Sequence, residues 1–259
     1  MSPRVSHAQE RAQALRQRLG LGDGYVDVFD VLRTMEIEVY RRPFPGDGLE
    51  GALTIRSGVP FIFVNSHGAL TRQRLTAAHE LGHYELGSRD EGTEVLEDIS
   101  GMTNGDEAEV FRFARHFLMD EKGVTITVAG LSDELQRAAA VASKYVVSPT
   151  VVAIHLAELG VLRPATKARL REGFDSGELK PGAFLGRYGY RMTELSDPAI
   201  ELDPGHVERA LLRYQDGSIS LAALAEVLMA PTDEARRMVV EAGAELRPED
   251  APEELVGQA

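Results

Sequence analysis

The sequence has 259 residues, of which 43% are hydrophobic, enough to bury one sizeable core or one core beside a smaller helical module. It contains no run of about 18 apolar residues, and its N-terminus leads into a charged stretch, so we expect neither a membrane span nor a secretory signal. Cysteine is absent, which excludes disulfides and thiolate metal sites and leaves histidine and carboxylate as the strong ligands. We therefore expect a cytoplasmic protein.

The N-terminal part of the chain, residues 1–123, predicts an α+β domain. The spacing of apolar residues and of glycines predicts helices over 7–19, 28–35, 71–86 and 106–119, a strand over 37–41, and a β-hairpin over 51–65 that turns at 57–58. The acidic stretch over 88–105 is interpreted either as a solvated surface excursion or as a loop that gates substrate. In the helix over 106–119, one apolar stripe is formed by Val110, Phe113, Ala114, Phe117 and Leu118.

After Gly123 the pattern is helical almost to the end of the chain. Two stretches, 132–162 and 206–243, look like helix-turn-helix units, and no internal repeat of fixed period is evident. We predict an α+β domain over 1–123, a helix-turn-helix-like segment over 124–163, and a helical extension over 164–259 that ends in a frayed tail.

The residues that carry chemistry lie in the helix over 71–86, which contains His79-Glu80-Leu81-Gly82-His83. Two histidines four positions apart project from one helix face and can share one Zn²⁺. Glu80 is offset by one position, where a carboxylate can take a proton from the attacking water. The alternatives are that both histidines are ordinary helix residues, or that they hold a metal without catalysis.

At this point the chain resembles a known family. The segment Leu75–Tyr84, which includes the two histidines, and the segment Glu109–Met119 are together similar to the ImmA/IrrE metallopeptidases. Those proteins are bacterial and phage-borne gluzincins, with a zincin fold and a zinc ion on two histidines and one glutamate. The chain departs from the family pattern at Val110, where a small residue is usual, and at Asp120, where proline is common.

The resemblance implies that Glu109 is the third zinc ligand beside His79 and His83. On a helical wheel, however, Glu107 and Asp106 lie nearer the centre of the apolar stripe. A ligand at a cleft belongs at the border of such a stripe, which favours Glu109 and keeps Glu107 as the reserve. A set of two histidines and a carboxylate also accepts Mn²⁺ or Fe²⁺.

The expected activity is hydrolysis of a peptide bond, with Glu80 as general base. Oxyanion stabilisation needs a further donor, and Tyr84 and His116 are candidates by proximity in the sequence. The resemblance implies that the substrate is a DNA-binding repressor with an XRE-type helix-turn-helix. The segment over 124–162 is interpreted as a docking surface for it, as a DNA-binding element, or as a helical bundle that closes the catalytic domain.

The rival hypotheses are a transcriptional regulator and a non-proteolytic interaction protein, each with a vestigial zincin domain. Direct DNA binding is disfavoured by the net charge of −13 of the whole chain. It is also disfavoured by the stretch over 206–243, where four Arg stand against six Asp or Glu, a net of −2.

Overall fold

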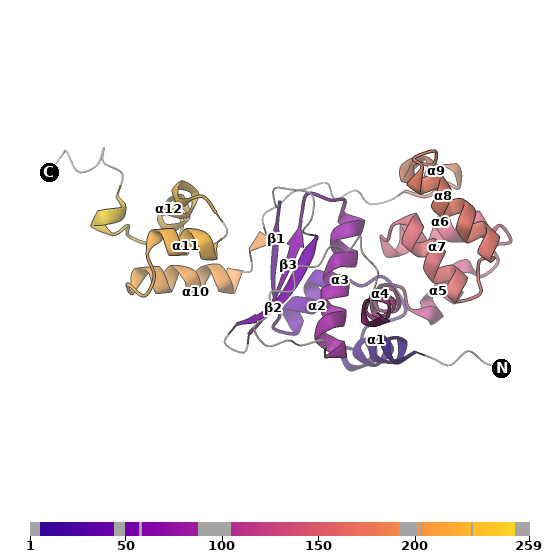
Figure 1. The fold of residues 1–259 in the computed structure, drawn as a ribbon, viewed down its shortest axis with the longest axis horizontal. Helices are drawn as coiled ribbons and strands as arrows, with labels where there is room; N and C mark the ends of the chain where they lie inside the picture. The colour runs from indigo at the N-terminus through magenta and orange to yellow at the C-terminus, as the bar shows by residue number, and fades with distance from the viewer. Residues whose placement is uncertain are drawn as a thin grey trace. The chain divides into compact units, whose positions relative to one another are not determined.

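The computed structural model describes residues 6–43, 50–56, 59–87, 105–191, 201–202, 204–228 and 230–251. They belong to two compact units, unit 1 (Met1–Ile200) and unit 2 (Glu201–Ala259), which carry separate cores (Figure 1). The predicted hairpin turn at 57–58, most of the acidic stretch over 88–105, and the end of the tail lie outside the described residues.

The first part of unit 1 confirms the predicted α+β fold. Its elements are α1 (His7–Arg18), α2 (Val28–Thr34), β1 (Glu38–Arg42), β2 (Gly51–Arg56), β3 (Val59–Asn65), α3 (Leu70–Leu86) and α4 (Gly105–Leu118). Strand β3 lies between the other two strands, antiparallel to β2 and parallel to β1. Val39 pairs with Ile62 across the parallel register, and both side chains are buried. The sheet therefore turns an aliphatic face toward the core.

Helix α3 lies between the sheet and α4 (Figure 1), so its side chains contact strands on one side and α4 on the other. The small or apolar residues Ala77, Ala78 and Leu81 are fully buried, as expected for a helix that is covered on two sides. The helix ends at Gly87, whose φ of 80° is the left-handed conformation that glycine adopts at little cost.

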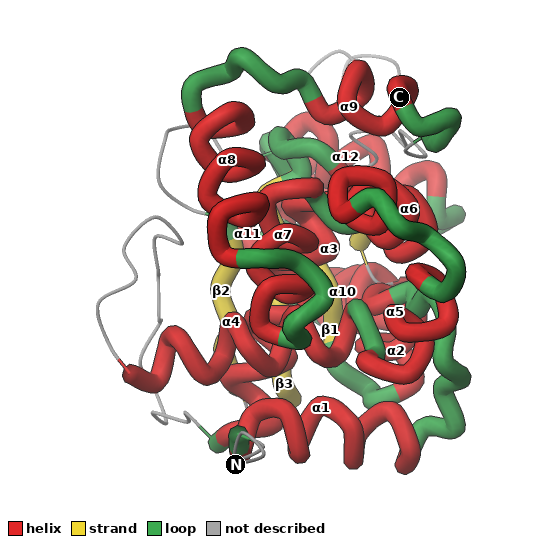
Figure 2. Tube along the Cα trace, turned by 90° about the vertical axis from the view of Figure 1, so that its right-hand side faces the viewer, coloured by secondary structure: helices red, strands yellow, loops and turns green. Residues whose placement is uncertain are grey.

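Helix α4 packs against both α1 and α3, and Figure 2 shows α1 running beside it. Every residue of the predicted apolar stripe is buried, namely Val110, Phe113, Ala114, Phe117 and Leu118. The helical period of the sequence thus identified the buried face of α4 correctly.

The remaining helices of unit 1 continue the same core. They are α5 (Glu121–Val128), α6 (Glu134–Tyr145), α7 (Pro149–Glu158), α8 (Pro164–Asp175) and α9 (Pro181–Arg187). One cluster of buried apolar residues extends from Ala8 to Leu185, across the predicted domain boundaries at 123 and 163. The division between the two units falls instead after Ile200.

Unit 2 is a small helical bundle with its own core. It contains the two-residue strand β4 (Glu201–Leu202), α10 (Pro204–Gln215), α11 (Leu221–Val227), α12 (Thr232–Glu241) and the 3₁₀ turn η1 (Pro248–Asp250). Tyr214, Leu224 and Val239 are fully buried and join its helices.

The helix pair α8–α9 recurs in the pair α10–α11, where each helix begins and ends 40 residues later. The turns match as well. Gly177 and Gly217 both have positive φ, and their amides donate to the carbonyls of Phe174 and Tyr214. Few identical residues accompany this match, so no repeat was evident in the sequence, but a glycine and an aromatic residue hold equivalent places.

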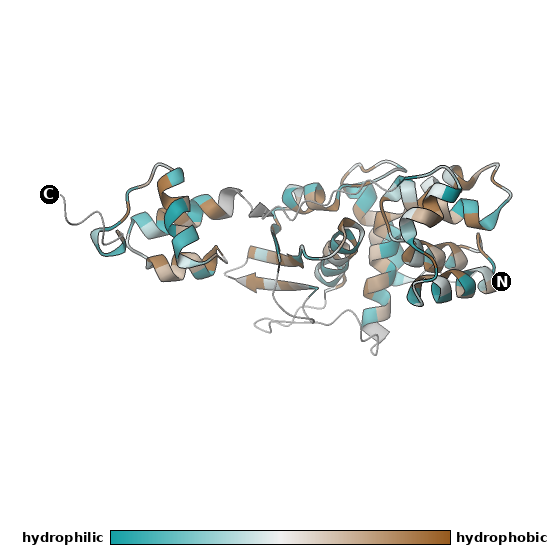
Figure 3. Ribbon diagram, turned by 90° about the horizontal axis from the view of Figure 1, so that it is seen from above, coloured by the Kyte–Doolittle hydropathy of each residue, from teal (hydrophilic) through white to brown (hydrophobic). Residues whose placement is uncertain are grey.

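No single helix in the described part of the chain is long and apolar enough to cross a membrane. The helices mix hydrophilic and hydrophobic residues (Figure 3). Helices α6 and α7 reach the required length and composition only as a pair, which is bent by 115°.

Candidate metal centre

Helix α3 brings the two predicted histidines together on one buried face. His79 and His83 are only 1% and 8% exposed, and their Nε2 atoms are 3.1 Å apart. The ring of Phe111 from α4 packs against His79, with 4.4 Å between the ring centroids. The spacing of four residues and the packing of α4 therefore fix both imidazoles.

The third group at this point is Glu107, the reserve residue of the sequence analysis. Its Oε2 is 3.2 Å from Nε2 of His79, and its Oε1 is 3.2 Å from Nε2 of His83. Glu107 precedes Val110 by three positions and therefore continues the buried stripe of α4 toward the N-terminus. Val110 in turn touches Gly82, where an added Cβ would be 3.0 Å from Cγ1 of Val110. The close approach of the two helices at Gly82 thus carries Glu107 to the histidines.

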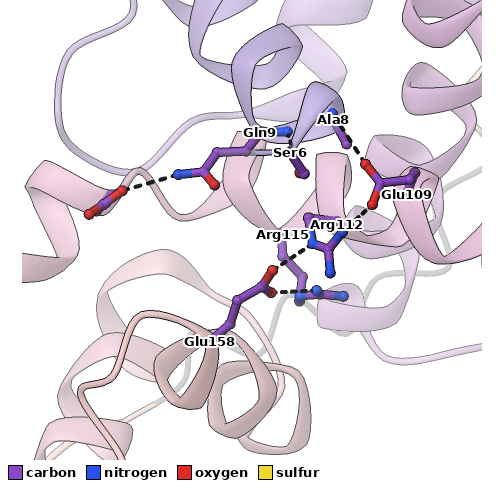
Figure 4. A network of polar contacts seen from close by, with 8 residues as sticks. Ser6, Ala8, Gln9, Glu109, Arg112, Arg115 and Glu158 are labelled. Atoms are coloured by element: carbon purple, nitrogen blue, oxygen red, sulfur yellow. Dashed lines mark hydrogen bonds and ion pairs between the residues drawn. The ribbon is translucent and has the colours of Figure 1, made fainter. Parts of the chain in front are cut away.

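Glu109, predicted as the third ligand, is not brought to the histidines. Its carboxylate accepts a hydrogen bond from the amide of Ala8 at 3.4 Å and forms an ion pair with Arg112 (Figure 4). Two positions along a helix rotate a side chain by about 200°, so Glu107 and Glu109 face opposite sides of α4. Because the apolar stripe of α4 faces α3, the residue that reaches the histidines is Glu107 on the stripe rather than Glu109 at its border.

The electrostatics of the site keep His83 available as a ligand. Burial, together with a smaller contribution from the neighbouring His79, lowers the pKa of His83 to about 4, and Glu107 opposes the shift. At neutral pH the His83 ring is therefore uncharged and offers a nitrogen lone pair.

The donor set fits a tetrahedral metal ion. With metal–ligand bonds of about 2.0–2.1 Å, two ligand atoms of a tetrahedron are roughly 3.3–3.4 Å apart. The two Nε2 atoms are 3.1 Å apart, and each lies 3.2 Å from one carboxylate oxygen of Glu107, Oε2 for His79 and Oε1 for His83. Three converging donors, two of them imidazoles, are typical of a catalytic zinc site that keeps one position open.

Glu80 follows His79 in α3 and lies against the start of β2. It is 5% exposed, and a Cβ added to Gly51 would be 3.1 Å from its Oε1 and 2.3 Å from Cγ2 of Thr76. The glycine therefore allows the strand to approach α3 closely at the position of the expected general base. A substituent on Gly51 would press directly on the turn of α3 that holds Thr76 and Glu80.

The two residues suggested as oxyanion donors lie in different surroundings. Tyr84 is partly buried and packs against the main core cluster. His116 is 2% exposed and is grouped with His155 and Glu158, in a second set of possible ligands. The ring centroids of the two histidines are 4.7 Å apart. No pattern in the sequence indicates this pairing, because the two histidines come from separate helices, α4 and α7.

A buried HExxH helix, a glutamate from the next helix and a small mixed sheet together define a domain of the metallopeptidase type. Comparison with protein families gives a more specific result: residues 33–157 match the peptidase family described as the IrrE N-terminal-like domain, which is the ImmA/IrrE family. No curated protein gave a significant match. The matched region begins in α2 and ends in α7, so it includes the whole candidate centre.

Proposed function

We propose that unit 1 is a zinc-dependent endopeptidase that cleaves a specific regulatory protein, namely a DNA-binding repressor with an XRE-type helix-turn-helix. The single observation that carries the peptidase assignment is the convergence of His79, His83 and Glu107 within 3.2 Å of one another beside Glu80. The family match over residues 33–157 supports the same chemistry. The repressor as substrate comes from the family resemblance.

In this proposal His79, His83 and Glu107 hold the ion, and Glu80 moves the proton. A bound Zn²⁺ supplies Lewis acidity for the attack on a peptide carbonyl. The carboxylate of Glu80 accepts a proton from the attacking water and then delivers it to the leaving amine. The burial of Glu80 matters because a carboxylate in a poorly hydrated site exchanges protons with the reactants rather than with bulk water.

The ligand assignment is tested by zinc content in purified full-length protein. We expect about one tightly held zinc at the centre in wild type, loss of that zinc in Glu107→Gln, and retention in Glu109→Gln. The two variants are matched, because each removes one carboxylate charge from the same helix. Loss in Glu109→Gln with retention in Glu107→Gln would restore Glu109 as the ligand.

The activity is tested by mapping new protein N-termini in cells that produce wild type or Glu80→Gln. A fragment of one regulator should appear only with wild type, and the purified pair should reproduce the cleavage. Loss of the general base should slow it by roughly 10²–10⁴-fold, while the zinc content stays the same. Equal fragment patterns from two zinc-loaded proteins would contradict the peptidase and favour a non-proteolytic interaction protein.

A further inference from the structure

A second group of metal-ligating side chains lies where α4 meets α7. His116 comes from α4, and both His155 and Glu158 come from α7. One ligand atom from each of the three lies within 4.8 Å of the others. His116 and His155 are 2% and 0% exposed, while Glu158 reaches the surface. The group shares no residue with the centre formed by His79, His83 and Glu107.

The hydrogen bonding of the two histidines leaves nitrogen atoms without partners. Nε2 of His155 is 2.9 Å from the carbonyl oxygen of Met119. Because a carbonyl only accepts, this nitrogen carries the proton, and Nδ1 of His155 presents a lone pair. Within the described residues, neither this Nδ1 nor Nε2 of His116 has a hydrogen-bond partner, although both are buried. Buried polar atoms are rarely left unpaired without an ion, a water or a strained site to explain them.

The same arrangement is typical of histidine bound to a metal. A ligating imidazole usually donates its second N–H to a carbonyl or carboxylate, which fixes the tautomer and the ring orientation. The carbonyl of Met119 does this for His155. Burial is the main cause that lowers the pKa of His116 to about 4 and that of His155 to about 3, so both rings are uncharged at neutral pH.

Two arginines set the charge of this site. Arg112 Nε donates to Glu158 at 2.5 Å, and an Arg115 terminal nitrogen donates at 2.7 Å (Figure 4). Burial by itself raises the pKa of Glu158, but these two arginines outweigh it and hold the pKa below its usual value. An ionised carboxylate has about four lone-pair positions, so it can accept both arginines and still face a cation. The guanidinium charges make the site weaker than the centre at His79 and favour a metal that is bound chiefly by imidazole.

We propose that His116, His155 and Glu158 form a second binding site for a transition-metal ion of the Zn²⁺ class, which links α4 to α7. The unpaired nitrogens, Nε2 of His116 and Nδ1 of His155, bind the ion. The ion thereby joins α4, the helix that carries Glu107, to the helix pair α6–α7. The proposal is independent of the peptidase assignment, since no residue of the first centre takes part.

The test uses full-length protein in which His79→Ala and His83→Ala remove the first centre. Metal-free protein is titrated with Co²⁺, whose visible d–d absorption reports a site with few ligands of nitrogen and oxygen type. We expect saturable binding of about one equivalent. Adding Glu158→Gln or His116→Gln should weaken the affinity for Co²⁺ roughly tenfold or more. The control His67→Gln removes an exposed histidine and should leave this affinity unchanged.

Glu158→Gln decides the question even if the buried histidine variant fails to fold, because Glu158 lies at the surface and keeps its size. Circular dichroism verifies folding in each variant. Absence of saturable Co²⁺ absorption in the folded background protein would overturn the proposal. So would absorption that survives Glu158→Gln and His116→Gln unchanged, or that disappears with His67→Gln.

Discussion

Gly51, the first residue of β2, shows how a single residue controls the surroundings of Glu80. It lies so close to α3 that an added Cβ would be 2.3 Å from Cγ2 of Thr76 and 3.0 Å from the carbonyl oxygen of Phe63. Contacts below 3 Å force a shift in one of the partners, and in a close-packed interior such a shift costs energy. The absence of a side chain at position 51 therefore allows strand and helix to meet beside the expected base.

We expect Gly51→Ala to lower the free energy of unfolding by roughly 1–3 kcal/mol, as overpacking usually does. The matched rescue is Thr76→Ser, which deletes the methyl group nearest to the new Cβ. The double variant should recover part of the loss in urea unfolding. If Gly51→Ala alone were neutral, or if Thr76→Ser gave no recovery, the close contact would not be what requires glycine here.

At the scale of elements, helix α6 is tied to α3 by a buried arginine. Arg74 is 1% exposed and donates to the carbonyls of Tyr145 and Val146, where α6 ends. It also donates to the carbonyl of Val26 and to the hydroxyl of Tyr25. A cation at the C-terminal end of a helix satisfies carbonyls that have no partner within the helix. The guanidinium thereby joins three segments that are distant in sequence.

Arg74→Met should destabilise unit 1 by roughly 3 kcal/mol or more, because buried carbonyls would lose their donors. Arg72→Met is the control, since Arg72 lies two residues away, is 62% exposed and pairs with Glu50. That exposed change should alter the unfolding free energy by only about 0.5 kcal/mol. Similar urea midpoints for the two variants would show that Arg74 does not hold α6 in place.

At the scale of the whole molecule, the two cores divide the chain differently from the predicted boundaries. The core of unit 1 includes Leu170, Phe184 and Leu185 from α8 and α9, while Ala210 is the first residue of the core of unit 2. Helices α5–α9 therefore complete the domain that holds the metal centre. A cooperative unit is defined by the core it shares, so unit 1 is expected to fold without the residues that follow it.

We predict that a chain that ends at Ile200 retains the zinc content of the full-length protein and unfolds in one cooperative transition. A chain that ends at Arg163, the predicted boundary, should lose cooperativity, because it lacks the buried residues of α8 and α9. Thermal unfolding by circular dichroism and elemental analysis measure both. Equal behaviour of the two truncated chains would mean that α8 and α9 add nothing to the fold.

The sequence by itself determined the local features of the site. The spacing of His79 and His83 places both on one face of any helix, and the apolar residues from Val110 to Leu118 mark the buried face of α4. These features depend only on helical geometry and on the burial of apolar side chains. The boundaries of α3 and the two strands of the hairpin also follow from local patterns, and they were predicted within one residue or so.

Only the tertiary structure decided which carboxylate joins the histidines. Helical periodicity allowed both Glu107 and Glu109, because it cannot tell which neighbour the apolar stripe of α4 faces. The contact of Val110 with Gly82 turns that stripe toward α3, and Glu107 lies on it. The pairing of His116 with His155 was hidden for a similar reason, since side chains from α4 and α7 meet only after the helices pack. Long-range packing sets these distances, and no local pattern encodes it.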